Sequence, residues 1–415
     1  GASVKDATAI RNVSEIISLF PNEEILVVVS AIGKTTNKLE EVNQAYQSMD
    51  KLTFLKSIAE LEKFHIDLVN QLIKTNSNPI YNKIEVVFDH LKAKFNLPYS
   101  EDFSFEYDQI VSLGEVLSSY ILSAYLSENN FSAMWIDARE LVQTDNNFQE
   151  ANVDWGKTEI AISKRILPKI KENKLLITQG FIGATADGES TTLGREGSDY
   201  SAAIFAYCCN AESVTIWKDV PGMLNADPKW FDNTIKLDSI SFKEAIELSY
   251  YGASVIHPKT LQPLQKKEIP LFVKSFINPL FPGTSVSKGE DLEPKTPCFI
   301  VKKEQLLLSL SSIDFSFIIE ENISEIFALF HQYKIKVSLI QNSAISFSVC
   351  IEDKFGNFSE LKNILSKKFK VSYNEKVSLY TIRHFDEKAA KMVEKDKTVL
   401  LKQISRETMQ IVTKE

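Results

Sequence analysis

Cysteine and histidine are both scarce, with four cysteines and five histidines among 415 residues. The cysteines are too few and too scattered for a disulfide framework or a paired-cysteine metal clamp, and the histidines lack the spacing of metal ligands. Cys208 and Cys209 are neighbours inside an apolar segment, where free cysteine behaves as a small core residue. We therefore expect reduced thiols and a cytoplasmic protein.

Long apolar runs and an excess of basic charge are also missing. No run of about 18 apolar residues is present, and the polar start GASVKDATAIRNV is unlike a secretory leader, so we expect neither a membrane span nor a signal peptide. The 47 Lys and Arg against 55 Asp and Glu give a net charge of −8, which argues against nucleic-acid binding. With 44% hydrophobic residues, the chain is expected to fold around two or three cores.

A continuous apolar run, ILVVVSAI at residues 25–32, predicts a strand that is buried on both faces of a parallel sheet. Helical patterns follow at 38–75 and near 106–127. Further strand-like runs lie at 131–137, 174–183, 213–220 and 269–275. Because strand-like and helical segments alternate over this part of the chain, the sequence predicts an α/β sandwich.

The composition changes at residues 282–298, which are rich in proline, glycine, serine and charge and predict a linker. Two units of strand-like and helical runs follow it: 305–312, 322–333 and 336–353 in the first, 377–384 and 386–396 in the second. Two small βαββ-type units after a large α/β domain predict an appended module, which is either regulatory or serves dimerisation.

Glycine is scarce as well, yet five of the 14 glycines lie within Gly180–Gly197. There a strand ends, a loop follows, and a helix is predicted to begin near Ser198 or Asp199. Such a loop lets backbone amides approach phosphate oxygens, Arg195 can pair with a carboxylate or phosphate, and Asp199 can hold Mg²⁺ directly or through water. An ordinary loop before a capped helix has the same pattern.

Polar residues lie at the end of the first predicted strand and inside an apolar helix. Ser30 and Thr36 follow the strand, where hydroxyl groups either bind a substrate carboxylate or form turns. Glu115 lies among apolar residues of SLGEVLSS and, if buried, needs a cation such as a substrate ammonium group; the alternative is an exposed glutamate. No Walker P-loop is present.

The segment WKDVPGMLNADPK at 217–229 follows a strand and contains turn chemistry. Lys218, Asp219 and Lys229 can hold a nucleotide there, or the segment is a plain connection. His257 precedes a proline and is expected to be a loop or helix-entry residue. No Ser/His/Asp grouping can be assembled from the sequence.

Seven segments, in order, resemble those of the aspartokinases in the amino acid kinase family. They are VVVSAIGKTTNKL (27–39), SLGEVLSS (112–119), MWIDARELVQTD (134–145), TQGFIG with TTLGREGSDYSAA (178–203), WKDVPGMLNADP (217–228), YYGASVIHPKTLQPL (250–264) and INPLFPGTSV (277–286). The resemblance covers essentially the whole chain, and TTLGREGSDYSAA is its most specific part.

The resemblance implies a three-layer α/β/α sandwich kinase domain at 1–284, a linker at 285–297 and a regulatory region at 298–415. That region would hold two ferredoxin-like ACT domains, one at about 305–370 and the other made of 298–304 with 375–415. Because exposed ACT edges favour pairing, we expect a homodimer through this region. The family's first strand carries the motif KFGGTS. The given sequence begins with GASV, inside that motif, and so does not include its lysine. Without that lysine, we expect the polypeptide as given to be severely impaired.

The resemblance also implies an activity: transfer of the γ-phosphoryl group of Mg·ATP to the β-carboxylate of L-aspartate, the first step of lysine, threonine and methionine biosynthesis. Matching residues would hold aspartate (Ser30, Thr36, Glu115, Arg195), act on the phosphates and metal (Arg195, Ser198, Asp199), bind the nucleotide (Lys218, Asp219, Leu224, Lys229) and contact an amino-acid effector (Ser338, Asn342, Ser343). Because a carboxylate is already ionised at neutral pH, this reaction needs no general base.

Two alternatives remain. One is another member of the amino acid kinase family, acting on glutamate or acetylglutamate, against which the two-ACT tail and the GE segment argue. The other is a non-catalytic amino-acid sensor, against which the intact segments around Glu115, Arg195 and Asp199 argue.

Overall fold

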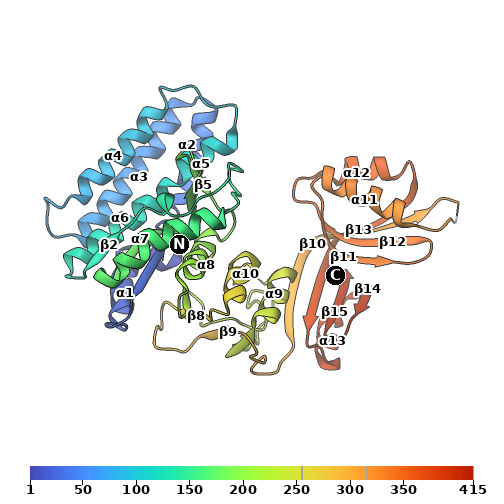
Figure 1. The fold of residues 1–415 in the computed structure, drawn as a ribbon. Coiled ribbons are helices and arrows are strands. Elements are labelled where there is room, and N and C mark those ends of the chain that lie inside the picture. The colour runs from blue at the N-terminus through green and yellow to red at the C-terminus, as the bar shows by residue number, and fades with distance from the viewer. Residues whose placement is uncertain (254–255, 315, 415) are drawn as a thin grey trace. The chain divides into compact units, whose positions relative to one another are not determined.

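The computed structural model describes the chain except residues 254, 255, 315 and 415, and the chain forms two compact units (Figure 1). Unit 1 comprises Gly1–Met223, Asp238–Phe242 and Ile256–Glu290, and unit 2 comprises Leu224–Leu237, Lys243–Val255 and Asp291–Glu415. Two short segments, 224–237 and 243–255, therefore fold together with the C-terminal part of the chain.

Unit 1 is built on a parallel sheet of three strands in the order β1 (Ile25–Val29), β3 (Leu175–Gln179) and β2 (Ala133–Trp135). Successive side chains of a strand point to opposite faces, so the sheet contributes to two separate cores. Ile177 belongs to one cluster of buried apolar residues and its neighbour Leu176 to another. Burial on both faces of the sheet explains why the run predicted as a strand at residues 25–32 is apolar throughout.

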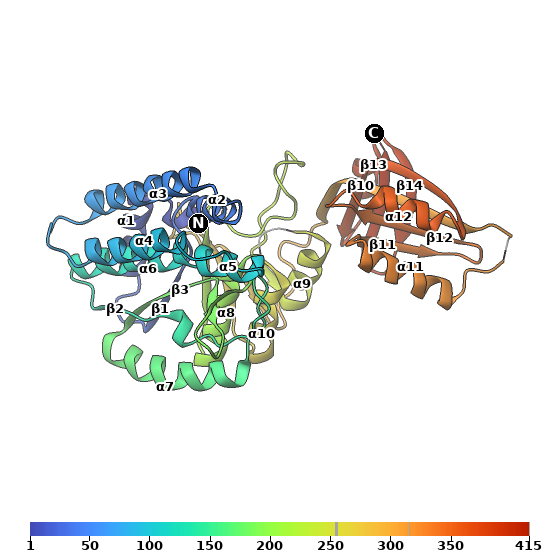
Figure 2. The ribbon, with the colours of Figure 1, turned by 90° about the horizontal axis from the view of Figure 1, so that it is seen from above.

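Helices cover both faces of this sheet (Figure 2). One face carries α1 (Ala7–Ser18), α2 (Thr35–Gln47), α3 (Lys51–Leu72), α4 (Ile80–Lys94), α5 (Phe103–Val111) and α6 (Leu113–Glu128), and the other α7 (Trp155–Asn173) and α8 (Gly197–Cys209). The predicted three-layer α/β/α sandwich is confirmed.

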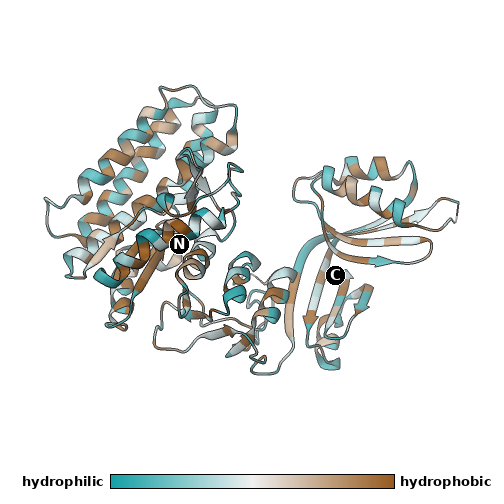
Figure 3. Ribbon diagram, viewed as in Figure 1, coloured by the Kyte–Doolittle hydropathy of each residue, from teal (hydrophilic) through white to brown (hydrophobic). Residues whose placement is uncertain are grey.

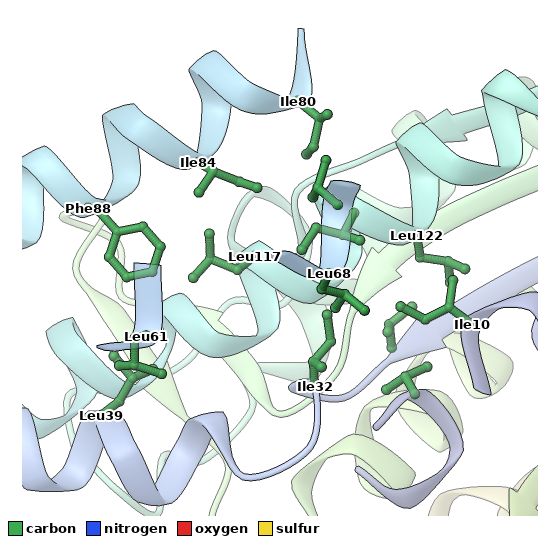
Figure 4. Packing of buried hydrophobic residues seen from close by; sticks show 14 of the residues in the cluster. Ile10, Ile32, Leu39, Leu61, Leu68, Ile80, Ile84, Phe88, Leu117 and Leu122 are labelled. Atoms are coloured by element: carbon green, nitrogen blue, oxygen red, sulfur yellow. The ribbon is translucent and has the colours of Figure 1, made fainter. Parts of the chain in front are cut away.

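The larger core lies between the sheet and the layer formed by α1 to α6. Leu39, Phe88 and Leu117 come from α2, α4 and α6 and pack together there (Figure 4). The outer helices are apolar on the side that faces this core and polar on the other (Figure 3). The stretch Phe103–Glu128 is apolar and long enough to cross a membrane, but 72% of its most apolar window is buried inside the protein, as in the core helix of a globular protein.

The rest of unit 1 follows the same alternation. A two-stranded pair, β4 (Ile182–Ala184) and β5 (Ser190–Thr192), precedes α8. A mixed sheet then has the order β6 (Val214–Lys218), β8 (Leu271–Ser275), β9 (Thr284–Ser287) and β7 (Ser239–Ser241), with α10 (Pro258–Lys267) before β8. The predicted linker 285–297 begins within β9.

Unit 2 contains one six-stranded antiparallel sheet and the helix α9 (Phe242–Tyr251) from Lys243 onward. Its two long strands, β10 (Cys298–Ser312) and β13 (Phe369–Arg383), pair along their lengths. Beside one half of this pair lie β12 (Ser346–Glu352) and β11 (Lys336–Asn342), covered by α11 (Glu320–Gln332) and α12 (Phe358–Leu365). Beside the other half lie β15 (Thr408–Lys414) and β14 (Thr398–Ile404), with α13 (Glu387–Glu394).

Candidate active site

The loop after β1 is held closely against α6. The carbonyl oxygen of Ser30 accepts a hydrogen bond from the Ser118 hydroxyl of α6 at 2.6 Å. A Cβ atom added to Gly114 would lie 3.2 Å from the Cβ of Ala31, so a side chain there would need a shift of a few tenths of an ångström between α6 and the loop. Thr36 is half-buried in the first turn of α2, directly after this loop.

Glu115 is only 3% exposed, next to the same loop. Its Oε1 accepts a hydrogen bond from the Ala31 amide at 3.2 Å, whereas its Oε2 is buried and has no hydrogen-bond partner within the described part of the chain. Burial raises the pKa of Glu115 to about 8, against the opposing effects of the Ala31 amide and the Gly1 amino group. The ionised form therefore needs a further cation, which a ligand ammonium group would supply.

The start of α8 lies at the carboxyl ends of β1 and β3. Gly180, just after β3, donates its N–H to the carbonyl oxygen of Val29 at 2.8 Å. A Cβ atom added to Gly180 would lie 2.7 Å from the Cβ of Ser198, so only glycine allows this approach. The structure therefore brings Ser30, Glu115 and Ser198 to one edge of the sheet, the edge at which parallel α/β sheets bind ligands.

An ion pair joins α8 to the end of β6. The Nζ of Lys218 lies 3.0 Å from the Oδ2 of Asp199, and both side chains are largely buried. Burial raises the pKa of Asp199, and the charge of Lys218 opposes that rise. The pair places one carboxylate and one ammonium group beside the N-terminal turn of α8, whose free amides favour anions.

Glu196 is a residue of this site that sequence reasoning missed. It precedes α8 in a left-handed backbone conformation, with φ of 55°. Its Oε2 is buried without a hydrogen-bond partner among the described residues, and burial raises the pKa of its carboxyl while Lys218 lowers it. The sequence contains a signal for it, because Glu196 is a second acidic residue only three positions before Asp199.

The remaining predicted residues lie in less enclosed places. Arg195 and Asp219 are exposed, on the loop before α8 and just after β6. His257 caps the N-terminus of α10 by accepting the Lys259 amide at its Nδ1, 3.2 Å away, as expected for a helix-entry residue. The described residues contain no group of three or more His, Cys, Asp or Glu side chains arranged to hold a metal.

Unit 2 carries the other predicted nucleotide contacts and the predicted effector contacts. Leu224 is half-buried and Lys229 is exposed. Ser338, on β11, accepts a hydrogen bond from the ammonium group of Lys302 at 3.2 Å. A pocket with polar residues of the β11–β12 turn on one side is lined by Gln341, Asn342, Ser343, Ser346, Ser348, Leu400, Leu401 and Lys402.

A second missed residue, Asp108, supports the loop that carries Arg195. Asp108 is fully buried in α5 and accepts hydrogen bonds from the Thr192 amide at 2.8 Å, the Thr192 hydroxyl at 2.7 Å and the Gln149 amide at 3.0 Å. Burial raises its pKa to about 6 despite these donors. Because Thr192 ends β5 three residues before Arg195, Asp108 fixes where that loop begins.

We expect Asp108→Asn to lower the stability of unit 1 by about 1–3 kcal/mol, because the amide replaces an acceptor with a donor that faces other donors. The native pKa lies above the unfolded value, so the native protein binds the extra proton between roughly pH 4 and 6 and loses stability as the pH rises through that window. Thermal unfolding from pH 4 to 8 should show a steeper loss of stability between pH 4 and 6 in the wild type than in the variant, which keeps the contribution of Glu115. An equal pH slope in both proteins would contradict it.

The known proteins that this chain resembles are enzymes. Residues 1–275 match the amino acid kinase family. Lysine-sensitive aspartokinase 3 of Escherichia coli K12 is 31% identical over 352 residues, which cover 85% of this chain and 77% of that protein. Chloroplastic aspartokinase 1 of Arabidopsis thaliana is 30% identical over 365 residues, covering 85% of this chain and 62% of that protein.

Two solved structures match the fold over the full length of this chain. The crystal structure of E. coli aspartokinase III in complex with aspartate and ADP matches with a TM-score of 0.82 at 26% identity, covering 100% of this chain and 94% of that chain. The aspartate kinase of Clostridium acetobutylicum shares the fold, with a TM-score of 0.82 at 22% identity, covering 100% of this chain and 95% of that chain.

Proposed function

The chain belongs to the aspartokinases of the amino acid kinase family. We propose that it binds L-aspartate at the edge of the unit 1 sheet and catalyses phosphorylation of the β-carboxylate there. The chain is an ATP-dependent kinase. The observation that carries the proposed site is the unpartnered, buried Oε2 of Glu115, which an α-ammonium group would satisfy. Ser30 and Thr36 would bind a carboxylate of aspartate, as would Arg195.

The chemistry needs placement and charge neutralisation more than proton transfer. An oxygen of the ionised β-carboxylate attacks the γ-phosphorus of ATP, the bond from that phosphorus to the β,γ-bridging oxygen breaks, and ADP leaves. Arg195 and Ser198 would contact the transferring group, and the free amides at the start of α8 would stabilise its negative charge. Lys218 and Asp219 would hold the nucleotide from the end of β6, and Leu224 and Lys229 from the segment that follows.

The residues near α8 fit a magnesium ion that accompanies the nucleotide. Mg²⁺ prefers oxygen ligands and is usually held by one or two carboxylates together with phosphates. Asp199 offers a carboxylate, and the buried Oε2 of Glu196 lacks a hydrogen-bond partner among the described residues. When bound, the metal would neutralise phosphate charge.

Unit 2 is proposed to be the regulatory region, with ACT domains at about 305–370 and at 298–304 with 375–415. The relative from E. coli is named lysine-sensitive, and its structure has been solved in complex with lysine. We propose an amino-acid effector at Ser338, Asn342 and Ser343. The ammonium group of Lys302 beside Ser338 disfavours a cationic effector there. A homodimer through the exposed sheet edges and a cytoplasmic location complete the proposal.

The proposed function is tested by trapping aspartyl phosphate with hydroxylamine, using the full-length protein with ATP, Mg²⁺ and aspartate. Parallel reactions contain glutamate or acetylglutamate in place of aspartate, and aspartate with added lysine, threonine or methionine. We expect hydroxamate with aspartate only. Hydroxamate with glutamate or acetylglutamate and none with aspartate would overturn the assignment of the substrate.

A further inference from the structure

The segment that carries two of the proposed nucleotide contacts folds as part of unit 2. Residues 224–237 form a narrow loop whose two arms are joined by a bridge between Leu224 and Lys236 and by a hydrogen bond from the Asn225 amide to the carbonyl oxygen of Ile235 at 2.9 Å. Lys229 lies at its exposed end. The position of this loop therefore depends on what holds its base.

Asn225 holds that base. Its side chain is 5% exposed, and its Oδ1 accepts the Ile235 amide at 2.7 Å, which closes the loop. Its Nδ2 donates to the carbonyl oxygen of Pro297 at 2.9 Å, and its own carbonyl oxygen accepts the Phe299 amide at 2.7 Å. One residue thus closes the loop and ties it to the start of β10, 72 positions away in the sequence.

Aromatic contacts fix the same loop to the same strand. The rings of Phe231 and Phe299 lie 5.1 Å apart, and the ammonium group of Lys303 lies 5.4 Å from the ring of Trp230. Phe231 also packs against a buried apolar cluster that includes Tyr380 and Ile382 of β13. The loop is therefore supported by both long strands of the regulatory sheet.

We propose that Asn225 is a positioning residue for the nucleotide: it sets the 224–237 loop on β10 and with it the two proposed nucleotide contacts that the loop carries, Leu224 and Lys229. This inference rests on the proposed function, which assigns Leu224 and Lys229 to the nucleotide. Coupling of this kind is reciprocal, so a bound nucleotide stabilises the start of β10 to the same extent.

The experiment compares Asn225→Ala with the matched control Asn357→Ala. Asn357 lies in unit 2 and also donates its Nδ2 to a backbone carbonyl, that of Tyr333, at 2.9 Å, at the start of α12 and not on the loop. We expect Asn225→Ala to weaken binding of a non-hydrolysable ATP analogue roughly tenfold, because two buried partners lose their hydrogen bonds. The control is expected to bind within about twofold of the wild type.

Two further readouts separate positioning from general damage. In steady state, Asn225→Ala should raise the KM for ATP and leave kcat and the KM for aspartate near those of the wild type. In hydrogen exchange, the ATP analogue should slow exchange of the Phe299 amide in the wild type and not in Asn225→Ala. Phe299→Leu, which removes the ring pair but keeps an apolar side chain, should weaken analogue binding by a smaller factor.

Equal analogue affinity in Asn225→Ala and Asn357→Ala would overturn the proposal, as would an equal rise of both KM values. Analogue binding is measured without aspartate. Suppose that the wild type binds the analogue but forms no aspartyl phosphate, and that Asn225→Ala no longer binds the analogue. These results would support the positioning role and reject the proposed substrate.

Discussion

Replacing Glu115 with glutamine is expected to lower kcat/KM for aspartate by roughly 100- to 1000-fold, because a buried charge pair with the substrate ammonium group is lost. Glutamine keeps the size of the side chain and the acceptor for the Ala31 amide. It removes the negative charge and turns the second oxygen into an NH2 group, which repels a substrate ammonium group. Binding of the ATP analogue without aspartate should stay near the wild-type value, and the two measurements together locate the defect in the amino-acid site.

Glu128→Gln is the matched control, since Glu128 ends the same helix at a half-buried position where its carboxylate accepts the Lys74 amide at 2.7 Å. We expect that variant to keep aspartate turnover within about threefold. A similar loss of kcat/KM in both variants would show that α6 tolerates no glutamine, and the ammonium contact would then be without support.

The pH dependence of the same residue gives a second check. The pKa of Glu115 is raised to about 8 in the folded protein, so most molecules carry a neutral Glu115 at pH 7. Because only the ionised form pairs with an ammonium group, kcat/KM for aspartate should rise from pH 6, reach half its maximum near pH 8 and level off above about pH 9. Stability changes in the opposite direction, since the native state binds more protons than the unfolded chain between roughly pH 4.5 and 8. Glu115→Gln should therefore be less active yet more stable at pH 8.

Segments with a strong local pattern were predicted well. The apolar run at 25–32 forms β1, and the runs at 174–183 and 213–220 contain β3 and β6. The helical pattern 38–75 is two helices, α2 and α3, because Asp50 caps a new helix by accepting the Thr53 amide at 3.1 Å. That cap was readable in the sequence, where an aspartate precedes an apolar periodic stretch.

Long-range partnerships could not be predicted from local pattern. Asp108 lies in a helix whose charges suggest a solvated face, and its partner Thr192 is 84 positions away. The 224–237 segment has ordinary turn chemistry, and nothing nearby in the sequence indicates that Asn225 binds Pro297. Glu115 could be singled out because a carboxylate among apolar helix residues is itself a local conflict, and the structure shows it buried with an unpartnered oxygen among the described residues. That it binds a ligand is our proposal.

The largest expected loss of stability follows from Arg383→Met in β13. Arg383 is 6% exposed and binds the 7% exposed carboxylate of Glu244 in α9 through Nε, at 2.9 Å, and through Nη2. Its Nη1 donates to the Thr408 hydroxyl at 2.7 Å, and His384 lies 3.2 Å from Glu244. Without the guanidinium group, the buried carboxylate keeps its desolvation penalty and loses its main counter-charge. We therefore expect unit 2 to lose about 3–5 kcal/mol of unfolding free energy.

The double variant Arg383→Met with Glu244→Leu should recover most of that loss, because two apolar side chains of similar size replace the pair and leave no buried charge. Lys368→Met is the matched control: Lys368 pairs with Glu325 at the surface, with side chains 63% and 42% exposed, and such pairs contribute at most about 1 kcal/mol. Urea unfolding of the four proteins measures these differences. An Arg383→Met protein as stable as Lys368→Met would show that the buried pair does not hold α9 on the six-stranded sheet of unit 2. A double variant less stable than Arg383→Met would show that the cost comes from packing and not from the uncompensated charge.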